Sequence, residues 1–493
     1  MRICLVIPPS IILAKERTFP HLGILSVASV LKSNAHEVDI VDLSGVKNYT
    51  EALGAYVRAN DTKVFGITAT SPQMPPAVKL LKVVREMRGE ETKVVLGGPH
   101  ATLTNSSRKK ELREGKHGRS ARHFKELSQL FDTQVAGDGE FAMLRVLENP
   151  KLRLVDADDP KSALWLRKYE LEGIPFPARE LLDLSSYNYS IDGVEATTML
   201  TQRGCPYNCG FCAGRNSPSL RILRATGTER TVAELRHLYE LYGYRAVMLY
   251  DDEVNINREM IHLMESIARL GDELKVEWRL RGFVKANLFT REQARAMYLA
   301  GFREILVGFE SGSPRILRNI KKQATLDQNS HCIEIAKSEG LRVKALISVG
   351  HPGESEETIR ETEEWILKIH PESFDISRIT VYPGSPYFDD GIEHPTTPGV
   401  WIYQVNGDRL YSEEVDFLQD FVYFKGRKGN LLGMDKFRTW TDFLTFEDLT
   451  NLKKETEDRL RQKLNQPYTT ETPGIIYEHS MGMGLPETIL RRK

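Results

Sequence analysis

The first 145 residues of this chain alternate short apolar runs with segments whose apolar residues recur at helical spacing. The expected strands are residues 3–7, 37–41, 64–68 and 93–96. Strands that alternate strictly with helices have crossover connections and run parallel to one another. The pattern therefore predicts an α/β domain with a doubly wound sheet over residues 1–145.

Small, polar and turn-forming residues follow the expected strands of this domain. In a doubly wound sheet, ligands bind outside the carboxyl ends of the strands, and small residues there allow the backbone to approach a ligand closely. The residues concerned are Pro9, Ser10, Thr70, Ser71, Gln73, Gly97, Gly98, His100, Gly139 and Glu140. We expect them to bind a cofactor, although His100 is equally well explained as a turn residue.

A second alternation begins near residue 195. Its expected strands are residues 196–200, 246–250, 276–280, 304–307, 343–349 and 376–381. Six strand–helix units predict a partial (β/α)6 barrel of the TIM type, in which the chemistry takes place at the carboxyl ends of the strands.

The remaining segments complete the expected domain organisation. Residues 146–190 contain the turn-forming segments 156–160 and 174–177 and are expected to be a linker. The barrel is expected over residues 191–390, where the alternation stops. Thr445 has the character of a helix N-cap, and residues 391–493 are expected to form a small, mostly α-helical region that closes over the barrel and contacts the substrate.

The composition argues against several classes of function. The formal net charge is -1, so no overall field favours nucleic acid or an anionic membrane. No apolar run approaches the roughly 20 residues that span a bilayer. The apolar stretch at the N-terminus is too short for a signal peptide. The basic stretch 108–125 is expected to be a solvated surface.

Five cysteines are present, and three of them lie within eight residues. An odd number with this clustering argues against a disulfide framework, and we expect a reducing, cytoplasmic location. Cys205, Cys209 and Cys212 are spaced C-x3-C-x2-C directly after the first expected barrel strand. Three thiolates on one short loop can hold three irons of a cubane cluster. The fourth iron is then open to the amino and carboxylate groups of S-adenosylmethionine.

A structural zinc site is the alternative for these cysteines. Such sites are closed by four ligands, usually from paired C-x2-C halves. The sequence has no second cysteine pair, and Cys332 stands alone in a helical pattern. The spacing therefore favours an iron–sulfur cluster.

The segment 205–212, CPYNCGFC, resembles the signature of the radical S-adenosylmethionine superfamily. The resemblance implies that these cysteines bind a 4Fe-4S cluster. It further implies that the acidic residues after the second barrel strand bind the methionine amino group, and that later strand ends contact the ribose and carboxylate. The matching residues are Asp251, Asp252, Glu253, Glu310, Ser311 and Gly350.

The first domain is similar to the cobalamin-binding domain of cobalamin-dependent radical enzymes. The matching segments are residues 8–9, 21–25, 36–38, 97–102 and 137–140. The motif D-x-H-x-x-G, whose His binds cobalt in many cobalamin proteins, is absent. The resemblance therefore implies cobalamin without an axial His from the protein, and we expect residues 70–74 to cover its lower face.

The resemblance implies a cobalamin-dependent radical C-methyltransferase. Such an enzyme transfers a methyl group from S-adenosylmethionine, by way of methylcobalamin, to an unactivated carbon after a 5'-deoxyadenosyl radical has abstracted hydrogen. The alternative is a non-methylating oxidation, cyclisation or rearrangement with the same cofactors. A methylthiotransferase is disfavoured because the first 200 residues hold only Cys4. A cluster-bearing sensor is disfavoured because it would not need the polar strand ends.

The expected partners follow from the same resemblance. An external electron donor such as flavodoxin or ferredoxin would reduce the cluster. The substrate stays open between a small molecule, a lipid and a peptide or protein side chain. The sequence identifies no general acid or base.

Overall fold

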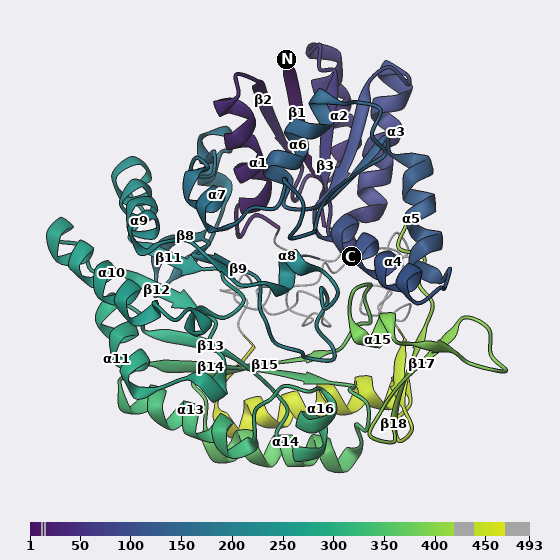
Figure 1. Ribbon diagram of the computed structural model, residues 1–493. Helices are drawn as coiled ribbons and strands as arrows, with labels where there is room; N and C mark the ends of the chain where they lie inside the picture. Colours follow the sequence, from purple (N-terminus) through teal and green to yellow (C-terminus); the bar gives the residue numbers. More distant parts are fainter. Residues whose placement is uncertain (11–12, 14–15, 419–437, 469–493) are drawn as a thin grey trace.

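The computed structural model describes residues 1–10, 13, 16–418 and 438–468. It contains a first α/β domain, a partial barrel and a C-terminal region (Figure 1). Within the described residues, no helix combines the length and the hydrophobicity that a membrane crossing requires.

The first domain is built on a six-stranded parallel sheet with the order β2-β1-β3-β4-β5-β6. Its elements are β1 (Arg2–Ile7), α1 (Leu22–Ser33), β2 (Glu37–Asp42), α2 (Tyr49–Ala59), β3 (Val64–Thr68), α3 (Met74–Arg88), β4 (Lys93–Gly97), α4 (Pro99–Arg113), α5 (Arg119–Leu130), β5 (Thr133–Gly137), α6 (Gly139–Glu148) and β6 (Leu154–Ala157). The expected doubly wound α/β class is confirmed.

Both faces of this sheet are apolar, which is why its strands read as continuous hydrophobic runs. Along β1, Leu5 belongs to a core with α1 and α6, whereas Val6 belongs to a core with α2 and α3. The strand order reverses direction between β1 and β3, and ligands of such sheets bind in the crevice outside that switch point.

Strand β6 lies in the segment that was expected to be a linker. It pairs in parallel with β5, with Gln134 opposite Leu154 and Gly137 opposite Ala157. The sheet therefore extends to residue 157. The connection to the barrel contains α7 (Lys168–Gly173) and β7 (Ser190–Ile191).

The partial barrel has six parallel strands, as expected. Its elements are β8 (Val194–Met199), α9 (Thr228–Tyr242), β11 (Ala246–Leu249), α10 (Met260–Leu274), β12 (Arg279–Gly282), α11 (Arg291–Ala300), β13 (Glu304–Glu310), α12 (Pro314–Asn319), α13 (Leu326–Ser338), β14 (Arg342–Val349), α14 (Glu356–Ile369) and β15 (Ser373–Arg378). Bridges from Leu280 to Phe302 and from Phe283 to Leu306 join β12 to β13. The third strand begins at Arg279, three residues later than expected, because 276–278 lead into the strand from α10.

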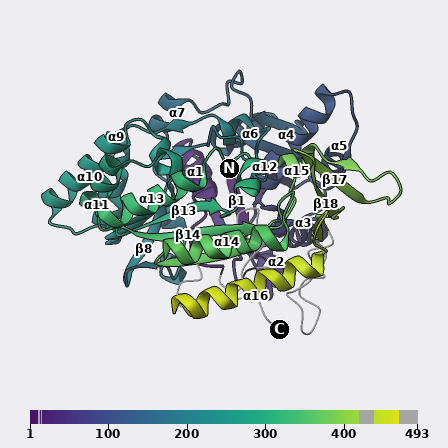
Figure 2. The same ribbon diagram turned by 90° about the horizontal axis from the view of Figure 1, so that it is seen from below.

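The C-terminal region contains a sheet that the expectation of a mostly helical region missed. After α15 (Pro386–Asp389), the strands β16 (Ile392–Glu393), β17 (Val400–Val405), β18 (Asp408–Glu413) and β19 (Thr439–Thr441) form an antiparallel sheet. Asn406 and Gly407 both have positive φ between β17 and β18, as a two-residue hairpin turn requires. The expected helix is present as α16 (Phe446–Leu464) and lies alongside α14 (Figure 2).

A glycine at the end of β5 tests how tightly β5 packs against the end of β6. Gly137 has a φ of +86°, and a Cβ there would lie 2.5 Å from the carbonyl carbon of Ala157 and from the nitrogen of Asp158. Gly193 has a φ of +76° with nothing within 4 Å of the same position. Both Gly→Ala variants should lose about 1–2 kcal/mol through the left-handed backbone. Gly137→Ala should lose about 1–3 kcal/mol more through overpacking.

Thermal unfolding of the two variants, followed by circular dichroism, measures this difference. We expect a clearly lower midpoint for Gly137→Ala than for Gly193→Ala. Equal shifts would contradict the tight closure of β5 against the end of β6.

Candidate functional site

The three clustered cysteines lie in a loop that leaves the barrel through a narrow neck. The neck consists of β9 (Gln202–Arg203) and β10 (Arg224–Ala225), which pair antiparallel with Arg203 opposite Arg224. In Figure 1, β9 and the short helix α8 (Pro218–Arg221) lie between the first domain and the barrel. Within the loop, the backbone nitrogen of Cys205 donates to Leu220 O at 3.0 Å.

The three thiols are free of disulfides and close enough to influence one another. Burial raises the pKa of Cys205 to about 12, and the carboxylate of Glu253 and the neighbouring Cys209 add to the rise. Cys212 is exposed at its edge, and the surrounding protein together with the nearby Cys209, Asp252 and Cys205 raises its pKa. Such thiols ionise when a metal compensates their charge. The donor set therefore fits a cluster held by three cysteines.

The described residues contain no group of three His, Cys, Asp or Glu side chains gathered around the position of a single metal ion. The assignment of Cys205, Cys209 and Cys212 as cluster ligands rests on their spacing in one loop and on their mutual proximity.

Three acidic residues follow β11. One of them is hydrogen-bonded within the protein, and the other two could bind a ligand. Asp251 is buried and accepts hydrogen bonds from the backbone nitrogens of Thr201 at 2.8 Å and Gln202 at 3.0 Å. Asp252 lines the cavity between the domains, where loss of solvent around its carboxyl raises the pKa to about 6. Burial raises the pKa of Glu253 to about 7, and its Oε2 is buried without a hydrogen-bond partner.

A buried acceptor oxygen without a partner is costly unless a ligand donates to it. An ammonium group near Asp252 and Glu253 would lower the pKa of both carboxyls and supply the missing donor to Glu253. These two residues therefore fit the amino group of S-adenosylmethionine.

The other residues expected to contact S-adenosylmethionine are hydrogen-bonded within the protein. Glu310 has a φ of +67° at a β-bulge and accepts from Lys322 Nζ at 3.1 Å and from Ser348 Oγ at 2.7 Å. Ser311 Oγ lies 3.1 Å from Thr362 Oγ1, and the backbone nitrogen of Gly350 donates to a carboxylate four residues on. Their contacts to the ligand stay a prediction.

A cavity of about 290 Å³ lies inside the first domain, between the sheet and the helices α1 and α6. Its lining includes Gly66, Gly97, Gly98, Gly139 and Glu140. A Cβ on Gly66 would lie 2.8 Å from Leu5 Cδ2, and a Cβ on Gly98 would lie 2.6 Å from Thr68 Oγ1. Only glycine fits at these two positions, so backbone lines this part of the cavity. A backbone lining allows close approach by part of a large cofactor such as cobalamin.

A second cavity, of about 450 Å³, lies between the first domain and the barrel. Thr70, Gln73 and Gly98 line it from the first domain, and Gly204 and Asp252 line it from the barrel. Gln73 is fixed there by a hydrogen bond from its Nε2 to Pro8 O at 2.8 Å. Residues expected on the cobalamin side therefore share one cavity with Asp252 and with Gly204, which directly precedes Cys205.

Four of the expected cofactor residues lie outside the two cavities. Ser71 Oγ lies 2.9 Å from Nδ1 of the fully buried His100, whose Nε2 lies 2.7 Å from His123 Nε2. Burial lowers the pKa of His100 well below its usual range, so the ring is neutral. Ser10 is buried beside Pro9, and its backbone nitrogen donates to a nearby glutamate. Neither Pro9, Ser10, Ser71 nor His100 lines the two cavities.

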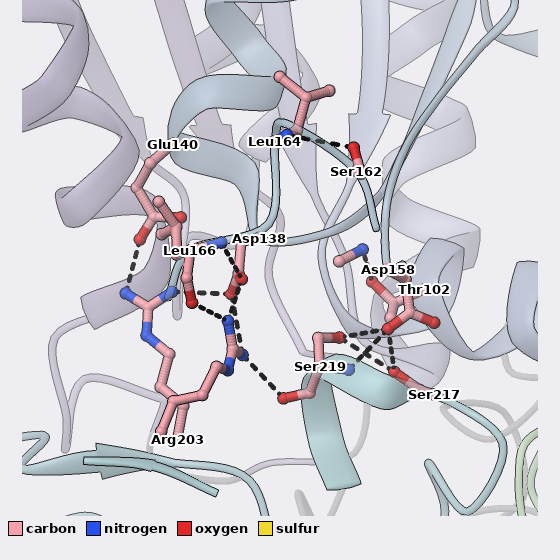
Figure 3. Close-up of polar contacts among 12 residues, drawn as sticks. Thr102, Asp138, Glu140, Asp158, Ser162, Leu164, Leu166, Arg203, Ser217 and Ser219 are labelled. Atoms are coloured by element: carbon pink, nitrogen blue, oxygen red, sulfur yellow. Dashed lines mark hydrogen bonds and ion pairs between the residues drawn. The ribbon is translucent and has the colours of Figure 1, made fainter. Parts of the chain in front are cut away.

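Glu140 lines the cavity of the first domain and also forms an ion pair with Arg203 of the barrel. Its Oε1 accepts from Arg203 Nη2 at 2.6 Å (Figure 3). It also accepts from Ser26 Oγ at 2.7 Å. Burial alone would raise the pKa of Glu140, but Arg203 and Ser26 lower it. The neighbouring Asp138, also bound to Arg203, was not expected to be a site residue. The sequence signal for it was its place in the segment 137–140, which resembles part of the cobalamin-binding domain.

Substitution of single cysteines tests the ligand assignment. We expect Cys205→Ala, Cys209→Ala and Cys212→Ala each to lose most of the bound iron and sulfide, because two thiolates cannot hold the cluster as three do. Cys332→Ala is the matched control, since Cys332 is buried in α13, in the core of the barrel.

The measurement is the iron and acid-labile sulfide content after anaerobic reconstitution. Full iron retention in any one of the three loop variants would contradict the assignment of that residue.

Comparisons with known proteins identify two domains in this chain. A family model for the radical SAM superfamily matches residues 199–366, and one for the B12 binding domain matches residues 11–115. An uncharacterized methyltransferase of Pyrococcus horikoshii is 29% identical over 399 residues, which cover 80% of this chain and 83% of that protein. An anaerobic magnesium-protoporphyrin IX monomethyl ester cyclase of Cereibacter sphaeroides is 24% identical over 354 residues, covering 69% of this chain and 55% of the cyclase.

The fold agrees with that of a solved structure. The radical S-adenosylmethionine methyltransferase TsrM from Kitasatospora setae, with tryptophan substrate and an S-adenosylmethionine analogue bound, superposes with a TM-score of 0.62 and 17% identity. The match covers 83% of this chain and 79% of that chain. The B12 binding domain, the radical SAM domain and their order together show that this chain belongs to the family of cobalamin-dependent radical S-adenosylmethionine enzymes, with a 4Fe-4S cluster, S-adenosylmethionine and cobalamin as cofactors.

Proposed function

We propose that this protein is a methyltransferase that moves a methyl group from S-adenosylmethionine, by way of cobalamin, to a carbon atom of its substrate. The observation that carries the proposal is the cavity shared by both domains, which Thr70 and Gly98 line from one side and Gly204 and Asp252 from the other. Two of the related proteins named above are methyltransferases, which supports the same reaction.

The bound cofactors would supply the chemistry: cobalamin would serve as the methyl carrier, and the cluster with S-adenosylmethionine would serve to activate the substrate. The protein holds these groups in place. In the proposal, Cys205, Cys209 and Cys212 bind the cluster. Asp252 and Glu253 bind the amino group of S-adenosylmethionine. An external electron donor reduces the cluster.

The wall of the shared cavity suits radical chemistry. Phe19, Leu22, Leu171 and Ile174 contribute apolar surface to it. An apolar wall keeps water and exchangeable protons away from a reactive intermediate. The same wall would hold a substrate carbon between the two cofactors, where proximity supplies much of the rate.

A non-methylating reaction with the same cofactors is the second candidate. The observation that favours it is the similarity to the magnesium-protoporphyrin cyclase. The two reactions differ in their products: the substrate gains a methyl group in the first, and it is oxidised, cyclised or rearranged without an added methyl group in the second. The product of the reaction therefore separates them.

Labelled S-adenosylmethionine provides that separation. With trideuteromethyl S-adenosylmethionine and the reduced, reconstituted protein, we expect the label to enter the bound cobalamin and then a product formed from a metabolite extract. Mass spectrometry of the extracted cobalamin and of the metabolites measures both steps. Formation of 5'-deoxyadenosine and a new product without label in either would overturn methyl transfer and favour the second candidate.

The role of Glu253 is open to a binding experiment. Glu253→Gln keeps the size of the side chain but removes its charge, and a hydrogen bond to a charged group contributes about 1.5–3 kcal/mol. We therefore expect the Kd for S-adenosylmethionine to rise about 10- to 100-fold. Equilibrium dialysis with the reconstituted protein measures it.

The matched control is Glu277→Gln, because Glu277 pairs with Arg279 at the exposed end of β12. An unchanged Kd in Glu253→Gln would show that Glu253 does not bind the amino group.

A further inference from the structure

Two acidic residues of the first domain bind both flanks of the cysteine loop. The loop is residues 204–223, and its neck is the pair of strands β9 and β10. Asp138 follows β5 and Asp158 follows β6, at the carboxyl edge of the sheet. Figure 3 shows the carboxylate of Asp138 near Arg203 of the neck and that of Asp158 near Ser217 and Ser219 within the loop.

Asp138 binds both arginines of the neck. Its Oδ1 accepts from Arg203 Nη1 at 2.9 Å and from Arg224 Nη2 at 3.3 Å, and its Oδ2 pairs with Arg224 Nη1. Glu140 binds the second guanidinium nitrogen of Arg203 at 2.6 Å. Asp138, Glu140 and Arg224 are each at most 7% exposed, so two carboxylates and two guanidinium groups compensate one another largely away from water.

Asp158 binds the loop on its other flank. Its Oδ1 accepts from Ser217 Oγ at 2.7 Å, from Ser219 Oγ at 2.6 Å and from the backbone nitrogen of Ser219 at 2.8 Å. Arg224 links the two contacts, because its Nη2 also donates to Ser219 O at 2.9 Å. The loop is therefore fixed to the first domain before and after its cysteines.

The local backbone supports a role beyond helix formation for Asp138. It occupies the N-cap of α6, where an aspartate ordinarily accepts from the first turn of the helix, yet it makes no such bond. Gly137 before it adopts a φ of +86° with no room for a side chain. The turn thus directs the carboxylate to the neck.

Buried ion pairs add little net stability compared with apolar packing, whereas their directional bonds restrict the geometry of a contact. The contacts described here join the two walls of the site. Asp138 and Arg203 line both the cavity of the first domain and the cavity shared with the barrel.

We propose that Asp138, with Glu140 and Asp158, is a positioning residue that fixes the distance and orientation of the cluster loop relative to the cobalamin-binding domain. This inference rests on the proposed function, because methyl transfer between the two cofactors needs that distance. Asp138 acts through Arg203 and Arg224 and does not touch the reacting atoms.

Asp138→Asn tests the proposal, since it keeps the size of the side chain and removes its charge. Glu414→Gln is the matched control, because the Arg122–Glu414 pair joins the first domain to the C-terminal region at the surface and does not contact the loop. Both variants are reconstituted as full chains, and their iron, sulfide and cobalamin contents are determined first.

The first readout is the dipolar interaction between the reduced cluster and cob(II)alamin in electron paramagnetic resonance, which falls with the cube of their separation. We expect Asp138→Asn to keep its cofactors but to show a shifted or broadened distance distribution. Glu414→Gln should match the parent protein, and Asp138→Glu, which restores the charge, should recover part of the parent spectrum.

The second readout is the ratio of two reactions that need no substrate. Methyl transfer to cobalamin needs both domains and should fall about 100-fold for a misplacement near 1 Å. Release of 5'-deoxyadenosine takes place on the barrel alone and should change little. Unchanged distances and an unchanged ratio in Asp138→Asn would overturn the proposal, even if the variant melts at a lower temperature.

Two further results separate a failure of the proposed function from a failure of the positioning role. If the parent protein transfers no methyl group to cobalamin, the proposed function fails, and the dipolar readout still tests the positioning role. If Asp138→Asn does not fold, the double variant Ser217→Ala and Ser219→Ala removes two hydroxyl donors to Asp158 without leaving an unpaired arginine. We expect it to broaden the distance distribution, and a parent-like distribution would overturn the proposal.

Discussion

The contact between Asp138 and the two arginines Arg203 and Arg224 joins the two halves of the site. Because all three side chains are largely withdrawn from water, each charge depends on its partner. Removal of one member of a buried pair typically costs about 3–5 kcal/mol, since it leaves the other charge uncompensated. These contacts therefore favour one relative position of the first domain and the cysteine loop.

This relative position matters because the carboxyl ends of the strands in the first domain face those in the barrel. In the first domain and in the barrel, parallel strands place every following loop at one end of the sheet. Gly98 and Thr70 come from one such end, and Gly204 and Asp252 from the other, and all four line one cavity. Two cofactors bound at facing edges can act on one substrate. Two unconnected domains of the same folds would not provide that arrangement.

Sequence patterns predicted the parallel strands well but not the direction of the side chains at their ends. Glu140, Asp251 and Ser311 were all expected to contact a cofactor, yet their side-chain oxygens bind Arg203, Thr201 and Thr362. A motif specifies which residue types follow a strand. The direction of each side chain depends on partners that the packing supplies, and those partners lie far away in the sequence. The hairpin of β17 and β18 was missed for another reason: its signal is the local turn Asn406-Gly407, which lies within a region read as helical.

The sequence alone determined the parallel α/β architecture of both halves and the loop that carries Cys205, Cys209 and Cys212, because these features depend on local periodicity and on spacing within a few residues. Only the tertiary structure decided that Asp138 binds Arg203, 65 positions away, and that Asp158 binds Ser219, 61 positions away. Such pairs form where two domains pack against each other. Strand and helix periods carry no information about that packing, so the relative placement of the two cofactor sites becomes visible only in the folded chain.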